Sequence, residues 1–131
     1  MRNIIRQTIV LPAPAETLFE MYLDPSRHSA IIGASAEIGS ERGSTFQAFG
    51  GELTGVILDV IKPRLIIKSW RSSAFKTEDL DSTLILSFTP EEDEGRIELI
   101  HLDVPDHDYD GVTQGWGKYY WEPWRAYLES R

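Results

Sequence analysis

The sequence of 131 residues contains no cysteine. It therefore has no disulfide framework, no thiol nucleophile and no thiolate metal site. Long apolar runs are also missing, because no stretch approaches the roughly 18 residues that a membrane-spanning helix needs. The opening residues, MRNIIRQTIV, lack the apolar core and the cleavage site of a secretory signal. These absences predict a cytoplasmic protein without a membrane segment.

Basic residues are scarce: 13 Lys and Arg stand against 21 Asp and Glu, which gives a net charge of −8. A surface that binds phosphate needs a basic face, so neither nucleic acid nor an anionic membrane is an expected partner. The glycines between residues 39 and 55 lack the strand–loop–helix context and the lysine of a phosphate-binding loop. No Ser–His–acid arrangement can be singled out. We predict no catalytic residue and no cofactor.

The first part of the chain alternates between one strand and two short helices. Ile4–Leu11 is rich in β-branched residues and predicts a strand. A short helix is expected to follow as far as Leu23. Asp24 is a capping residue and Pro25 suits the first helical position, so a second helix is expected from Pro25 to about Ile32. The length fits a single domain over residues 1–131.

Six more strands are expected after the helices, joined by short turns. Such a succession favours an antiparallel meander. Gly55 lies inside one of these strands and indicates a bulge or the close approach of another element. The predicted strands are Ala34–Ile38, Thr45–Phe49, Leu53–Ile61, Leu65–Arg71, Ser82–Thr89 and Arg96–Val104.

The last pattern, Asp110–Leu128, is a helix with an aromatic face. A rotation of about 100° per residue gathers its large side chains on one side. Asp110 is expected to cap this helix, and Pro123 is expected to bend it. Trp121 falls outside the aromatic face. Its exposure would suggest a homodimer contact, which we favour, and the alternative is that a loop such as Ser72–Asp81 covers it. The predicted buried face consists of Val112, Trp116, Tyr119, Tyr120, Pro123 and Tyr127, with Trp124 and Leu128 on its flank.

Only this terminal helix is long enough to cover the concave face of a curved sheet. The expected fold is therefore α+β: a helix-grip fold in which about seven antiparallel strands wrap around the C-terminal helix. Two short helices after the first strand complete the plan.

Four segments carry a resemblance to a known family. They read GSTFQAFGGELTG, KPRLIIKSWR, HLDVP and GWGKYYWEPWRAYL. In these segments the chain resembles activator of Hsp90 ATPase homologue-like (AHSA1-type) domains of the START/Bet v 1-like (SRPBCC) superfamily. The most specific points are Trp70-Arg71, Gly115-Trp116 and the ending from Trp124 to Leu128. The resemblance implies a helix-grip fold with a deep, mostly apolar cavity.

Five residues are predicted to line that cavity, because strand alternation or helical spacing turns each of them inward. Lys68 shares the inner face with Ile66 and Trp70, and we expect its amine to extend from the cavity mouth towards solvent. The predicted lining residues are Phe46, Trp70, His101, Trp116 and Tyr120.

His101 has two interpretations. Among apolar side chains it could orient a ligand carbonyl or act as a general base; the alternative is a core histidine held by one hydrogen bond. A second pattern is a candidate metal cluster, in which His101 and Asp103 can lie side by side on one strand face and Asp106, His107 and Asp108 follow Pro105. Those three lie in a predicted loop, and a metal site needs ligands that converge on a fixed frame. No metal site is predicted.

Three functions remain open. The preferred one is non-enzymatic binding of a small hydrophobic or aromatic molecule, a role in keeping with the stress proteins and carriers of the superfamily. The second is a co-chaperone-like contact with a protein, as in Hsp90 activators. Eukaryotic activators carry a further N-terminal domain for which this chain leaves no room, so we rank that role second. The third is a cyclase- or hydrolase-type enzyme that uses His101.

Overall fold

The computed structural model of the chain describes residues 3–130. In this range seven antiparallel strands form one sheet in the order β1-β7-β6-β5-β4-β3-β2. The predicted α+β helix-grip fold is confirmed. The strands are β1 (Ile4–Leu11), β2 (Ala36–Ile38), β3 (Thr45–Ala48), β4 (Leu53–Ile61), β5 (Leu65–Ser72), β6 (Ser82–Glu91) and β7 (Glu94–Leu102).

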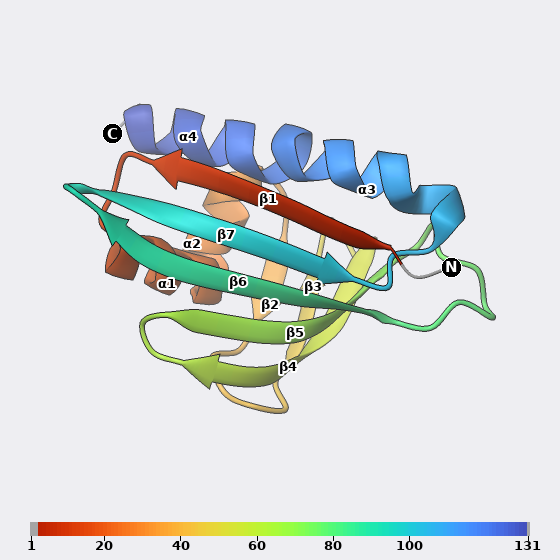
Figure 1. Ribbon diagram of the computed structural model, residues 1–131. Coiled ribbons are helices and arrows are strands. Elements are labelled where there is room, and N and C mark those ends of the chain that lie inside the picture. The colour runs from red at the N-terminus through yellow and green to blue at the C-terminus, as the bar shows by residue number, and fades with distance from the viewer. Residues whose placement is uncertain (1–2, 131) are drawn as a thin grey trace.

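The helices are gathered on one side of the sheet, as Figure 1 shows. Helices α1 (Ala15–Leu23) and α2 (Pro25–Ile32) follow β1, and α1 packs on β6 and β7. The C-terminal helix runs along β1 and has three parts: α3 (Tyr109–Trp116), a π-helical turn (Gly117–Trp121) and α4 (Glu122–Glu129). A 3-10 turn, Asp106–Asp108, precedes α3. None of the helices within residues 3–130 is long and apolar enough to cross a membrane.

Hydrogen bonds attach the C-terminal helix to β1. Gln7 is the main point of attachment: its Nε2 donates to the carbonyl of Thr113 at 2.9 Å, and its Oε1 accepts from the Trp121 indole at 2.7 Å. Further along, Arg125 donates to the carbonyl of Val10 at 2.7 Å. The helix is thus fixed along the length of an edge strand.

One row of side chains crosses the concave face of the sheet. Residues that pair across antiparallel strands point to the same face, so the row can be followed through the strand register. All its members are buried, and two of the five are basic. The row reads Ile57, Lys68, Leu84, His101 and Ile5.

The π-helical turn corrects the predicted aromatic face. The N–H of Glu122 bonds to the carbonyl of Gly117, five residues back. A wider turn of this kind delays the helix by about one residue, or roughly 100°. Trp121 consequently turns inward and is only 7% exposed, whereas Tyr119 turns outward and is 49% exposed. Both predictions were wrong, and the exposed tryptophan that suggested a homodimer contact does not exist.

Pro123 gives the physical reason for that turn. It has no N–H, and in a regular helix its ring would press on the carbonyl of Tyr119. The π-helical turn lies directly before it, where the regular ladder would otherwise be broken. The irregularity is thus local, and the helix continues through α4.

The predicted cap at Asp110 was also wrong. The helix begins one residue earlier, at Tyr109, and Asp108 precedes it without a side-chain capping bond. Asp110 lies in the first turn, where a carboxylate still interacts favourably with the helix dipole. By contrast, the Asp24 side chain caps α2 as expected, accepting from the N–H groups of Ser26 and Arg27.

Gly55 marks a close approach between β4 and β5, as the sequence suggested. A methyl group at this position would overlap the carbonyl oxygen of Ser69 on the neighbouring strand. The register also shifts between Ile57 and Asp59, which indicates an irregularity in the same strand pair. Only glycine fits here without moving one strand away from the other.

Two glycine substitutions should therefore have opposite effects on stability. Gly55→Ala is expected to lower the free energy of unfolding by about 1–3 kcal/mol, because backbone must move to accept the methyl group. In Gly117→Ala the nearest atom outside the local helix backbone is 3.8 Å from the new Cβ, and helix propensity predicts a gain of up to about 1 kcal/mol. Urea unfolding of both variants tests this. An unchanged Gly55→Ala protein would show that β4 and β5 separate at no cost.

Candidate functional site

A cleft opens between the C-terminal helix and the end of the sheet formed by β4 and β5. Its volume is about 390 Å³. Aromatic and small residues make most of its walls, and α3 supplies one side while the β3–β4 turn supplies the other. The lining residues are Phe49, Glu52, Leu53, Trp70, Ser72, Asp108, Gly111, Val112, Gly115, Trp116, Tyr119 and Tyr120.

The structure brings three of the five predicted cavity residues together at this cleft: Trp70, Trp116 and Tyr120. The other two are buried, but they do not line it. Phe46 lies deeper, with its ring 5.8 Å from that of His28. His101 packs behind Trp70, with 4.7 Å between the two ring centroids.

Phe49 is a wall residue that the sequence did not reveal. It follows β3 with φ = 56°, a left-handed conformation that costs a bulky side chain of the order of 1–3 kcal/mol. Its ring lies 5.8 Å from Tyr119 and 6.4 Å from Tyr120, in edge-to-face arrangements. The strained backbone therefore holds an aromatic ring against the helix at the edge of the cleft.

His101 belongs to a chain of hydrogen bonds that joins helix to sheet. The Trp116 indole donates to its Nδ1 at 3.2 Å, and its Nε2 lies 2.8 Å from Ser82 Oγ. Ser82 in turn donates to the carbonyl of Trp70 at 2.6 Å. Since Nδ1 accepts, the ring proton must sit on Nε2 and be donated to Ser82. Burial, and next the neighbouring Lys68 amine, lower the pKa of His101 to about 3, so the ring is neutral at pH 7.

His28 forms a similar link on the other side of the core, and the sequence gave no reason to select it. Its Nδ1 bonds to the carbonyl of Tyr22 at 2.7 Å, so Nε2 must accept from the Tyr120 hydroxyl at 2.8 Å. Burial is the main cause that lowers the pKa of His28 to about 3, and Lys68 adds to it. Burial likewise raises the pKa of the Tyr120 hydroxyl, which stays protonated as the donor.

Lys68 does not extend from the cavity mouth, so that prediction was wrong. Its side chain is completely buried, and Nζ lies 3.0 Å from the centroid of the Phe46 ring and 4.9 Å from that of Tyr22. Within residues 3–130, Nζ has no hydrogen-bond partner. Burial lowers the pKa of this amine well below its usual 10.5. An amine without a partner in an aromatic interior costs folding free energy.

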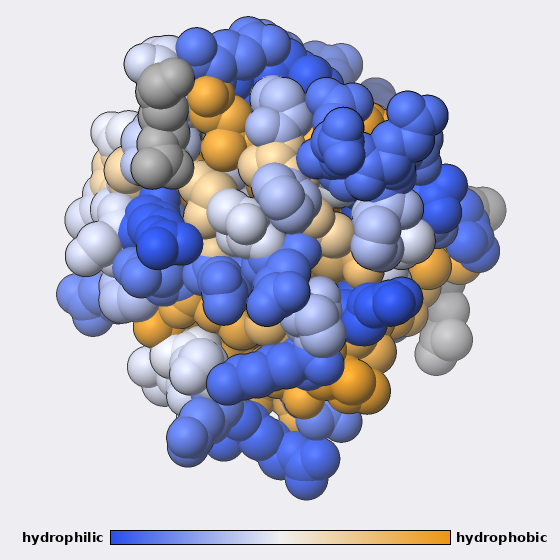
Figure 2. All heavy atoms as spheres, turned by 90° about the vertical axis from the view of Figure 1, so that its left-hand side faces the viewer, coloured by the Kyte–Doolittle hydropathy of each residue, from blue (hydrophilic) through white to orange (hydrophobic). Residues whose placement is uncertain are grey.

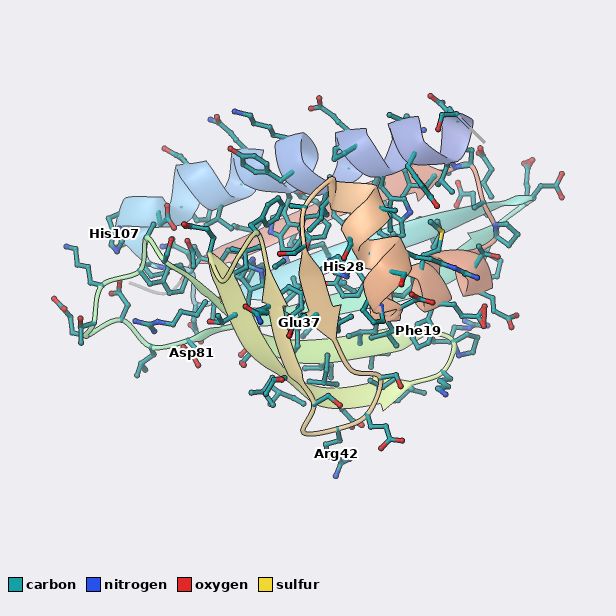
Figure 3. All side chains as sticks on the ribbon, turned by 180° about the vertical axis from the view of Figure 1, so that it is seen from behind. Phe19, His28, Glu37, Arg42, Asp81 and His107 are labelled. Atoms are coloured by element: carbon teal, nitrogen blue, oxygen red, sulfur yellow. The ribbon has the colours of Figure 1, made fainter. Side chains whose placement is uncertain are left out.

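Acidic residues and a folded loop border the cleft near the start of α3. His107 Nε2 lies 2.8 Å from Asp79, and this contact ties residues 73–81 to the segment before α3. Arg71 holds the same loop through the carbonyls of Lys76 and Asp79 at 2.7 and 2.8 Å. In Figure 3, His107 lies beside the start of the C-terminal helix, whereas His28 lies in the interior. Burial raises the pKa of Asp108.

Metal-ligating side chains do not converge anywhere in the part of the chain that the structure describes. His101 faces the interior, while His107 pairs with Asp79 at the surface. A second hollow, of about 330 Å³, lies near α1 and the β4–β5 turn. Its only aromatic residue is Phe19, whose ring is buried in the core, so this hollow lacks the aromatic walls of the cleft.

Comparison with known proteins agrees with this architecture. Residues 12–129 match the family described as "Activator of Hsp90 ATPase homolog 1-like protein". The chain belongs to this family. It is 24% identical over 107 residues to the human activator of 90 kDa heat shock protein ATPase homolog 1, covering 82% of this chain and 31% of the human protein. The chain thus spans about a third of the curated relatives that it matches.

Solved structures show the same fold. An HSP90 activator from Plasmodium falciparum superposes with a TM-score of 0.86 at 21% identity, over 96% of both chains. Ara h 8.0201 superposes over the whole of both chains with a TM-score of 0.79 at 12% identity. At such identities the likeness establishes the Bet v 1-like helix-grip fold of this family member, and function must be argued from its own residues.

Lys68 should make the stability of the domain depend on pH. Because its pKa is lowered in the folded state, the unfolded chain binds one more proton between that pKa and 10.5, so stability should rise with pH in this window. Lys68→Met should remove this rise and add about 1–3 kcal/mol at pH 7, since it replaces an unpaired polar group with an apolar one of similar size. Urea unfolding at pH 7, 8 and 9 gives the slope.

The matched control is Lys76→Met, which changes an exposed lysine. It should leave both stability and slope close to those of the natural chain. A Lys68→Met protein that is less stable than the natural chain would mean that the amine has a partner after all.

Proposed function

We propose that this domain binds a small hydrophobic or aromatic molecule in the cleft between the C-terminal helix and the sheet. The observation that carries the proposal is the cleft itself. Its volume of about 390 Å³ falls within the range of small-molecule sites, and its walls are mostly rings and aliphatic groups. Rigid rings of tryptophan, tyrosine and phenylalanine offer flat apolar contact at little cost in side-chain entropy.

Binding without catalysis fits the two histidines of the interior. A general base needs a free nitrogen within reach of the substrate. Both nitrogens of His101 are engaged, by Trp116 and Ser82, and both nitrogens of His28 are engaged, by Tyr22 and Tyr120. Neither ring lines the cleft. The geometry therefore supports a structural role for both, and this argues against the enzyme that the sequence left open through His101.

A fluorescent apolar dye should bind in the cleft, and Phe49→Gly should weaken that binding about tenfold by removing one ring from the wall. Glycine accepts the left-handed backbone of residue 49 without strain, so the variant should unfold at nearly the same urea concentration as the natural chain. Fluorescence titration measures the affinity. Unchanged dye affinity in a folded Phe49→Gly protein would place the dye elsewhere, and no binding at all would refute the proposed function.

A second candidate function is contact with an Hsp90-type chaperone, which the names of the human and Plasmodium relatives support. The convex side of the sheet offers a surface for it. We call this surface the convex strip; it comprises Val56, Leu58, Ile67, Ile85 and Ile100. The last three pair across β5, β6 and β7 and are partly exposed. An apolar surface of this kind is typical of a protein contact.

Stimulation of a purified Hsp90 ATPase would test this second candidate. Leu58 is 43% exposed, more than any other residue of the strip, so Leu58→Lys should abolish any stimulation and leave dye binding intact. If the two surfaces act separately, Phe49→Gly should weaken dye binding and leave any stimulation of the ATPase unchanged. Lack of stimulation by the natural domain at a large molar excess would remove the chaperone role and leave the cleft proposal standing.

A further inference from the structure

Every charged residue that lines the cleft is acidic. The lining holds two carboxylates, Glu52 and Asp108, and no Lys, Arg or His. The two approach from different elements: Glu52 lies in the turn between β3 and β4, and Asp108 directly precedes α3. The chain as a whole carries a net charge of −8. A ligand in the cleft therefore meets a negative potential from both walls.

Aromatic rings make up much of the remaining cleft lining. Trp70, Trp116, Tyr120, Tyr119 and Phe49 all line the cleft. The face of an aromatic ring is negative, so it attracts a cation placed over it by about 0.5–2 kcal/mol, the larger value when water is excluded. Rings and carboxylates together are the chemistry that recognises organic ammonium ions. An organic anion would be repelled by both carboxylates.

Basic groups close to the cleft are occupied or point elsewhere. The Arg71 guanidinium is held by backbone carbonyls of the 73–81 loop and by Asp81 at 3.1 Å. His107 pairs with Asp79, and Lys68 is buried against Phe46. The exposed Lys118 places its amine 5.3 Å from the centroid of Tyr119.

We infer that the cleft is selective for hydrophobic organic cations: molecules with an aromatic or aliphatic body and a primary to quaternary ammonium group. The body lies against the rings, and the ammonium group lies between Glu52 and Asp108. This inference rests on the proposed function, because it names the chemical class of ligand for the same cleft. It adds a selectivity that apolar walls alone would not produce.

Three naphthalene compounds of nearly equal shape separate the charge from the apolar body: naphthalen-2-ylmethylammonium, naphthalen-2-ylmethanol and naphthalene-2-carboxylate. Calorimetric titration at neutral pH and low salt gives their affinities. The ammonium compound should bind about tenfold more tightly than the alcohol, and the carboxylate should bind most weakly. Added salt should reduce the advantage of the ammonium compound, because at least one of the carboxylates is exposed to solvent.

Variants assign the preference to the two carboxylates. Glu52→Gln combined with Asp108→Asn should bring the ammonium compound close to the affinity of the alcohol, while the alcohol itself binds as before. Glu37→Gln is the matched control, since it removes an exposed carboxylate on β2 away from the cleft and should leave the order unchanged. Should the double variant fail to fold, the order of the three compounds on the natural chain still decides.

The outcomes distinguish this inference from the proposed function. Equal affinity for the ammonium compound and the alcohol, or tighter binding of the carboxylate, would overturn the cation selectivity and leave a cleft for hydrophobic ligands. Failure of all three compounds and of the fluorescent dye to bind would remove both the selectivity and the binding function. A preference that survives in the folded double variant would also overturn the inference, because groups other than Glu52 and Asp108 would then recognise the ammonium charge.

Discussion

The hydrogen-bond chain from Trp116 through His101 and Ser82 to the Trp70 carbonyl is the constraint on which the cleft end of the molecule depends. It runs from the C-terminal helix through β7 and β6 to β5. It holds the Trp116 indole through its N–H and ends at the backbone carbonyl of Trp70, whose own indole N–H has no hydrogen-bond partner within residues 3–130. This series of hydrogen bonds requires a neutral His101, because one ring nitrogen must accept while the other donates. Burial supplies that condition by opposing the charged form. Burial of His101 therefore preserves the tautomer that joins the helix to the sheet beside the cleft.

Polar groups inside this domain fall into two classes with different energetic meaning. His101 and His28 use both ring nitrogens and connect elements that are far apart in the sequence. The Lys68 amine is buried against Phe46 and has no hydrogen-bond partner within residues 3–130. Its desolvation therefore lowers the free energy of unfolding. It shares one cross-strand row with His101, and its proximity contributes to the lowered pKa of both histidines. The strand register thus places Lys68 where it lowers the pKa of both buried histidines.

The two proposed functions use different surfaces of the same fold. The proposed protein contact uses the convex strip, which is partly exposed. The cleft lies on the other side of the sheet. Most of its lining is aromatic, and its charged residues are acidic. At the end of the molecule shown in Figure 2, apolar side chains are interspersed with hydrophilic ones, and no single large patch dominates the view. Ligand binding and protein contact therefore need not compete.

Local patterns in the sequence determined the strands, the two short helices, the inward direction of Phe46, Trp70 and His101, and the close approach at Gly55, because alternation, proline positions and missing side chains act over a few residues. They did not determine the depth of Lys68, the partners of His28 or the place of Phe49 at the cleft edge. Those depend on contacts between residues up to 92 positions apart, such as His28 with Tyr120. The π-helical turn shows most clearly where local sequence patterns stop and tertiary contacts decide. A regular wheel placed Trp121 outside and Tyr119 inside, but Pro123 and the attachment to Gln7 favour one wider turn, and only tertiary packing could choose where that turn would fall.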